Sequence, residues 1–179
     1  MGIDPAQLHI LRYPDPALRR KAAPIDTVDE AVRAVARRMI ELMHEAEGVG
    51  LAAPQVGVPW RLFVTQPPED VRDHEPFGPG RVYINPALDI VSKELEVREE
   101  GCLSLPNIRV DVRRPSAVTI TAQDLEGRTF SETRDDLMAR VWQHEFDHLN
   151  GVLIIDRMSP MDRIARRKDI RDLERASRQ

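Results

Sequence analysis

The sequence has a single cysteine, and the lack of a second thiol restricts what the first can do. Cys102 is the only cysteine among the 179 residues, so no disulfide bond can form within the chain. Its thiol can therefore serve as a core residue, as a nucleophile or as a metal ligand.

Long apolar runs, internal repeats and a strongly basic composition are also missing. No run approaches the length of a membrane span, and residues 1–10 lack a positive segment followed by an apolar stretch. We therefore expect a soluble cytoplasmic protein without a membrane partner. The formal net charge of −4 argues against a surface that binds nucleic acid throughout, and we expect no DNA partner. The 179 residues, 41% of them hydrophobic, predict a single domain over residues 1–179.

Helical periodicity first appears near residue 28. Thr27 and Glu30 have the spacing of a capping box, which predicts a helix start. Apolar residues then recur at helical spacing at Val28, Val32, Val35, Met39 and Leu42. We therefore predict an amphipathic helix that ends near Gly48.

Strand patterns follow this helix. β-branched or alternating runs predict strands at residues 62–64, 82–84, 108–112 and 118–121. Because no helix-length crossover separates them, we expect mainly antiparallel sheets. Proline, glycine and acidic residues predict an extended loop at residues 67–80.

Two further helices are predicted near the end of the chain. The second covers residues 134–149 and is ended by Asn150 and Gly151. The third begins at Ser159 as N-cap, with Pro160 at the first helical position. Helices at both ends with strands between them predict an α+β fold.

The predicted second helix contains HEFDH, which satisfies the H-E-x-x-H pattern. A spacing of four puts His144 and His148 on one helical face, so both imidazoles can bind one metal ion. Glu145 lies about 100° round the helix from His144, where it can contact a metal-bound water without being a ligand. Leu137 and Val141 share the histidine stripe, so the histidines could instead be semi-buried core residues. Two histidines beside a glutamate would be costly to bury uncompensated, which favours the metal.

A catalytic zinc-type centre needs a third protein ligand and one open position. Downstream of His148 there is no histidine or cysteine, only acids such as Asp156. Cys102 is therefore the candidate, against the alternative of a buried apolar cysteine. The neighbouring Gly101 allows a close approach of the backbone to a site, and we include it among the substrate-contacting residues.

Three segments resemble the motifs of the peptide deformylase family. They read GVGLAAPQ at residues 48–55, EGCLS at residues 100–104 and QHEFDHLNG at residues 143–151. The resemblance extends from about His9 to about Asp169. It implies antiparallel sheets packed around the helix with the histidines. It also implies a metal-dependent hydrolase that removes the formyl group from the N-terminal formyl-methionine of nascent polypeptides and releases formate.

The resemblance also implies the roles of particular residues. The metal ligands it implies are Cys102, His144 and His148. A metal-bound water attacks the formyl carbon with Glu145 as general acid/base, while Gln55 and the Leu103 N–H stabilise the oxyanion. The family implies Fe²⁺ in the cell, although two imidazoles and a thiolate also suit Zn²⁺, Ni²⁺ or Co²⁺.

We expect the substrate peptide to pair with the backbone at Gly50, where a side chain would obstruct it. Gly48 could equally be part of a helix C-cap and turn. Val49, Leu137 and Val141 are predicted to form the apolar pocket for the methionine side chain, although apolar helix residues are commonly core.

Two charged residues near the motifs remain. Arg140 precedes His144 by one turn; it could stand at the pocket mouth, but we expect its guanidinium to reach solvent. The resemblance implies that Glu100 pairs with an arginine near Arg114 and so supports Cys102.

The C-terminal tail, from about residue 158 to residue 179, is basic. From Arg157 onward there are eight Lys or Arg and four Asp or Glu, in a chain that is negative overall. The residues that could form a basic helical face for ribosomal RNA are Arg163, Arg166, Arg167 and Lys168. A solvated helix is the alternative.

Two rival functions are a zinc endopeptidase and a metal-binding protein without catalysis. The upstream cysteine ligand argues against the endopeptidase. Glu145 and Gln55, which are not needed to hold a metal, argue against the non-catalytic protein.

Overall fold

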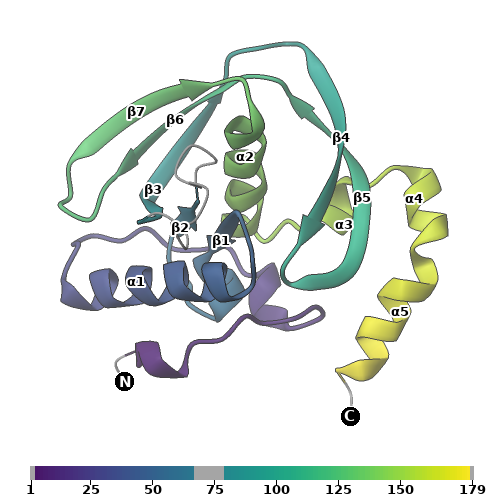
Figure 1. Cartoon of the computed structure of the whole chain (residues 1–179), viewed down its shortest axis with the longest axis horizontal. Helices are drawn as coiled ribbons and strands as arrows, with labels where there is room; N and C mark the ends of the chain where they lie inside the picture. Colours follow the sequence, from purple (N-terminus) through teal and green to yellow (C-terminus); the bar gives the residue numbers. More distant parts are fainter. Residues whose placement is uncertain (1–2, 67–78, 178–179) are drawn as a thin grey trace, which may run out of the picture.

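The computed structural model describes residues 3–66 and 79–177, and its fold is α+β, as the sequence predicts (Figure 1). A helix, α2 (Leu137–Leu149), lies between a five-stranded sheet and a two-stranded ribbon (Figure 1). The extended loop predicted at residues 67–80 lies outside the described residues except for its last two.

The larger sheet has the strand order β1-β2-β3-β6-β7, and every neighbouring pair is antiparallel. Its strands are β1 (Gly50–Ala52), β2 (Leu62–Thr65), β3 (Arg81–Ile90), β6 (Val118–Gln123) and β7 (Thr129–Arg134). The expected strands at 62–64, 82–84 and 118–121 are thus present, and β1 and β7 are additional. The short β1 begins at Gly50, within the GVGLAAPQ motif, and it contacts α2.

The smaller sheet is an antiparallel ribbon of β4 (Leu95–Cys102) and β5 (Leu105–Pro115). The register shifts between Gly101 and Cys102, where β4 turns into β5. Residues 108–112 lie within β5, as predicted, whereas β4 was not predicted. Cys102 therefore stands at the tip of this ribbon.

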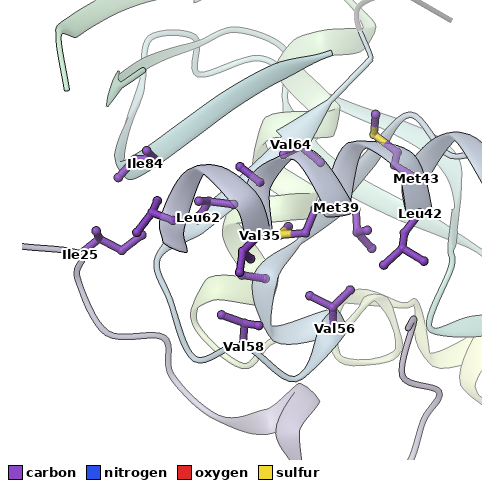
Figure 2. Packing of buried hydrophobic residues seen from close by; sticks show 14 residues of the cluster. Ile25, Val35, Met39, Leu42, Met43, Val56, Val58, Leu62, Val64 and Ile84 are labelled. Atoms are coloured by element: carbon purple, nitrogen blue, oxygen red, sulfur yellow. The ribbon is translucent and has the colours of Figure 1, made fainter. Parts of the chain in front are cut away.

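The helix α1 (Glu30–Glu45) begins two residues later than the capping-box spacing suggested. Asp29 is the N-cap, and its side chain accepts a hydrogen bond from the Val32 N–H at 2.9 Å. The predicted cap at Thr27 is wrong because Asp29 offers a carboxylate at the helix start. The apolar face of α1 packs on β1 and β2 (Figure 2).

The helix α2 begins at its N-cap Asp136, whose side chain accepts from the Met138 N–H at 3.0 Å. It ends at Asn150 and Gly151, as predicted, and Gly151 has the left-handed φ of 72° that favours glycine. One side of α2 packs on the five-stranded sheet, where Trp142 meets the edge of the Tyr83 ring. Its other side faces the β4–β5 ribbon.

After α2 come α3 (Ile154–Arg157) and, in the C-terminal tail, α4 (Pro160–Ala165) and α5 (Arg167–Ala176). Ser159 caps α4 and Pro160 opens it, as predicted. The single expected tail helix is interrupted at Arg166. Tyr13 donates a hydrogen bond to Glu174 at 3.0 Å and ties α5 to the N-terminal segment. Among the described residues, no helix is both long and apolar enough to cross a membrane.

Candidate active site

Three side chains with metal-ligating atoms converge between α2 and the tip of the β4–β5 ribbon. The Nε2 atoms of His144 and His148 lie 3.2 Å apart, and the His148 Nε2 lies 3.3 Å from the Cys102 Sγ. All three ligand atoms lie within 4.8 Å of one another, so they could hold one metal ion. The structure therefore brings together the three residues that the sequence analysis selected as ligands.

The protonation of His148 suits a metal. Burial lowers the pKa of His148 well below its usual value, helped by the charge of His144. Its imidazole is therefore neutral, which is the form that binds metals. The His148 Nδ1 is buried and has no hydrogen-bond partner among the described residues. One thiol and two imidazoles form a donor set that binds zinc, iron, cobalt or nickel.

Glu145 lies beside these ligands on α2 and is 4% exposed. Its Oε2 has no hydrogen-bond partner in the part of the chain that the structure describes. Burial raises the pKa of Glu145 to about 7, against the opposing charge of His144. The position thus holds a carboxyl group that can exchange a proton near neutral pH.

Gly50 on β1 lies against Glu145. A β-carbon at position 50 would stand 2.9 Å from the Glu145 Cδ, closer than real β-carbons come to such atoms. Glycine at this position therefore leaves room for the Glu145 side chain, a reason that the sequence analysis did not consider. At Gly101, in contrast, the nearest atom to an added β-carbon would be Arg109 Cγ at 3.7 Å, an ordinary contact.

Gln55 has a buried side chain with a defined orientation. Its Oε1 accepts from the Ala52 N–H at 2.8 Å, and its Nε2 lies 3.2 Å from the Ser104 Oγ and 3.6 Å from the Cys102 Sγ. The amide N–H groups are thereby directed toward the Cys102 Sγ and the Ser104 Oγ. Leu103 follows Cys102 in the turn and packs against the cluster between α1 and the sheet.

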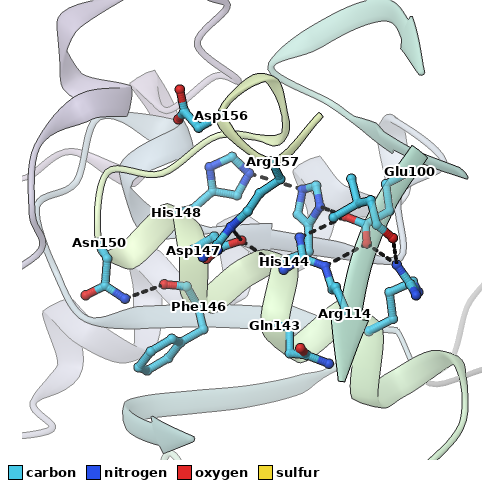
Figure 3. A network of polar contacts seen from close by, with 12 residues as sticks. Glu100, Arg114, Gln143, His144, Phe146, Asp147, His148, Asn150, Asp156 and Arg157 are labelled. Atoms are coloured by element: carbon cyan, nitrogen blue, oxygen red, sulfur yellow. Dashed lines mark hydrogen bonds and ion pairs between the residues drawn. The ribbon is translucent and has the colours of Figure 1, made fainter. Parts of the chain in front are cut away.

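A network of charged residues, most of them buried, extends behind Cys102, His144 and His148 (Figure 3). Arg114 donates to both oxygens of Glu100, at 2.7 and 2.9 Å, and to Asp147 at 2.9 Å. Arg157 also donates to Asp147. The Glu100 Oε2 lies 3.1 Å from the His144 Nδ1, which leaves the His144 Nε2 for a metal. The expected pairing of Glu100 with Arg114 is therefore present.

Burial would raise the pKa of Glu100, but the hydrogen bonds with Arg114 and His144 hold it well below its usual value. Glu100 is consequently a carboxylate at any ordinary pH. Burial acts to lower the pKa of His144, but hydrogen bonds with Cys102 and Glu100 hold it well above its usual value.

Arg140 does not reach solvent, so that expectation was wrong. It is 8% exposed and donates to the Glu100 Oε1, to the Val112 carbonyl and to the Glu96 carbonyl. These buried acceptors need donors, and the guanidinium supplies several in one plane. The sequence alone gave no signal of where these acceptors lie.

A cavity of about 700 Å³ opens beside the ligands. Cys102, His144 and Glu145 line it, and so do all five residues selected for substrate contact. Those five are Val49, Gly50, Gly101, Leu137 and Val141. Val49 and Leu137 are 50% and 44% exposed, so their side chains are available at its wall. Ile108 and Arg109 of β5 also line it and were missed, because only the pairing of β5 with β4 brings them to the site.

The fold and the site together define an α+β protein of the H-E-x-x-H class, with a cysteine beside the two histidines as a third residue able to bind a metal. The family model for polypeptide deformylase matches residues 7–164. This chain belongs to the polypeptide deformylase family.

Individual relatives agree with this assignment. A peptide deformylase of Thermotoga neapolitana is 46% identical over 166 residues, which cover 93% of this chain and 96% of the relative. A plant peptide deformylase crystal structure superposes with a TM-score of 0.90 at 38% identity, covering 99% of this chain and 94% of the other. The Thermotoga maritima enzyme superposes with a TM-score of 0.76 at 44% identity, covering 86% and 98% of the two chains. As a member of this family the protein is a hydrolase.

Proposed function

We propose that this protein removes the formyl group from the N-terminal formyl-methionine of nascent polypeptides and releases formate. The observation that carries the proposal is the buried Glu145 carboxyl group, whose Oε2 has no hydrogen-bond partner among the described residues, beside three converging atoms able to bind a metal. A carboxyl oxygen without a hydrogen-bond partner is costly to bury. Glu145 lines the cavity, so its carboxyl group can exchange protons with a bound substrate.

We further propose that Cys102, His144 and His148 hold one divalent metal ion. Fe²⁺ is the proposed metal in the cell, and Zn²⁺, Ni²⁺ or Co²⁺ would suit the same donor set. When bound, such an ion lowers the pKa of a coordinated water and polarises a carbonyl oxygen.

Glu145 is the proposed general acid/base. It takes a proton from the attacking water and later donates one to the departing amine. The peptide then leaves with a free N-terminal amino group. Gln55 Nε2 and the Leu103 N–H are the proposed donors to the carbonyl oxygen as negative charge develops there. The hydrogen bond from the Ala52 N–H to the Gln55 Oε1 supports this role, since it turns the Gln55 amino group toward Cys102.

The cavity suggests how the substrate lies. We propose that Val49, Leu137 and Val141 contact the methionine side chain, and that the peptide backbone runs along Gly50 and Gly101. Apolar walls with polar groups at one end are the usual form of a small-molecule pocket.

The basic tail is the proposed ribosome contact of a protein acting in the cytoplasm on emerging chains. Arg163, Arg167 and Lys168 are exposed on α4 and α5. Arg166 instead forms an ion pair, in which its Nη1 lies 3.7 Å from the Asp169 Oδ2. Reversing the charge of the three exposed residues should weaken co-sedimentation with ribosomes. Unchanged co-sedimentation would leave the tail as a solvated helix.

The function is tested by anaerobic kinetics of formate release from a formyl-Met-Ala-Ser peptide by Fe²⁺-loaded protein. We expect release by the wild type and a loss of about 10²- to 10⁴-fold in Glu145→Gln with the metal retained. If the loaded wild type releases no formate, the proposal is wrong, and cleavage of internal peptide bonds would be the next activity to assay.

A further inference from the structure

We propose that Arg140 is a positioning residue for the metal centre, because it fixes the β4–β5 ribbon against α2. This inference rests on the proposed metal-dependent function. It assigns a role to a side chain that neither offers a ligand atom nor belongs to the groups proposed to touch the reacting atoms.

The candidate ligands come from two separate elements. Cys102 is the last residue of β4, whereas His144 and His148 lie on α2. The three ligand atoms can converge only if the ribbon and the helix keep one relative position. Contacts between β4 and α2 therefore control the geometry of the site.

Arg140 makes such contacts to both strands of the ribbon. It stands one helical turn before His144, and its Nη1 donates to the Glu100 Oε1 at 2.7 Å and to the Val112 carbonyl at 3.0 Å. Its Nη2 donates to the Glu96 carbonyl at 2.9 Å. One guanidinium thus joins α2 to β4 and to β5 at once.

Glu100 transmits this restraint to the ligands. It lies two residues before Cys102 on the same strand, and its two oxygens are both tied to α2: Oε1 by Arg140 and Oε2 by His144. The carboxylate therefore cannot shift without disturbing the His144 ring. A carboxylate that orients a ligating histidine in this way tunes both its direction and its basicity.

Arg114 does not duplicate this link. It binds Glu100 from within the ribbon and reaches Asp147, which lies beyond His144 on α2. Arg140 acts at the opposite end of the helix, before His144. Its side chain and that of Glu100 are 10% and 6% exposed, so water cannot readily replace the contacts.

The test measures Zn²⁺ affinity by competition with a chromogenic chelator, which needs no enzymatic assay. The variants are Arg140→Leu, Arg140→Lys and, as a matched control, Arg113→Leu. Arg113 is an exposed arginine of the same ribbon, on the opposite side of β5 from Arg114. We expect Arg140→Leu to bind Zn²⁺ about 10- to 100-fold more weakly, Arg140→Lys to recover part of the loss, and Arg113→Leu to match the wild type.

A second readout separates positioning from a general loss of stability. In Co²⁺-loaded protein, the absorption bands of the thiolate–cobalt bond and of the metal should shift in Arg140→Leu but not in Arg113→Leu. If Arg140→Leu does not fold, Arg140→Lys carries the test through its affinity and spectrum. Zn²⁺ affinity within twofold of the wild type, with an unchanged Co²⁺ spectrum, would overturn the proposal. A wild type that fails to bind Zn²⁺ would instead contradict the proposed metal site itself.

Discussion

Gly50 and Glu145 pack so closely that a β-carbon at position 50 would stand 2.9 Å from the Glu145 Cδ. The two residues belong to different elements, β1 and α2. The conformation of the proposed general acid/base therefore depends on the absence of a side chain across from it.

Gly50→Ala should displace the Glu145 carboxyl group and lower kcat for formate release by about 10²-fold, since a misplacement near 1 Å can have this effect. The metal content should stay at the wild-type level. Gly127→Ala is the control, because nothing lies within 4 Å of an added β-carbon there and its φ of 76° affects only the stability of a turn. Equal kcat values for Gly50→Ala and the wild type would contradict the packing argument.

Gln55→Ala should lower kcat by roughly 10²- to 10³-fold with little change in KM, because an oxyanion donor acts mainly on the transition state. Steady-state kinetics with the metal content matched between proteins would measure this. Ser104→Ala removes only a neighbour of the Gln55 Nε2 and should have a much smaller effect. A rise in KM with unchanged kcat would mean that Gln55 binds substrate rather than the oxyanion.

Glu100→Gln should destabilise the metal-free protein by roughly 3–5 kcal/mol at pH 7, because it leaves buried guanidiniums without their anion. The folded pKa of Glu100 is lowered below its usual 4.5, so its contribution is complete above about pH 4.5. The contribution is lost as the pH falls below that value toward the folded pKa. Free energies of unfolding measured from pH 7 to pH 3 should therefore converge for the two proteins. A constant difference over this range would be evidence against the ionised pair.

Asp136→Ala should lower the free energy of unfolding by about 1 kcal/mol, since it removes the N-cap of α2. Asp136→Asn keeps an acceptor for the Met138 N–H and should cost less. Urea unfolding monitored by circular dichroism would compare the two. The same loss in both variants would point to the ion pair with Arg134 instead of the cap.

The elements that sequence reasoning predicted best are those with a local signal. The start of α4 at Ser159-Pro160 and the end of α2 at Asn150-Gly151 follow from capping preferences of a few residues. The two histidines were found because their spacing fixes them on one helical face. These features depend little on the rest of the chain.

The features that were missed depend on distant partners. Four of the eight residues of β4 are charged, so its sequence is typical of a polar loop. Only its pairing with β5 makes it a strand. Arg140 was expected in solvent because its acceptors lie 28 to 44 residues away in the sequence. Thr27 and Asp29 were both suitable caps, and the structure has Asp29 at the helix start, where it accepts from the Val32 N–H.

The position of Cys102 at the ribbon tip has a thermodynamic consequence. Cys102 and His148 are 46 residues apart in sequence, so a shared metal ion would act as a reversible cross-link between the ribbon and α2. An ion bound only by the folded chain adds about 4 kcal/mol of stability when its free concentration is a thousandfold above Kd. A melting curve recorded against metal concentration would then report occupancy of the site without any substrate.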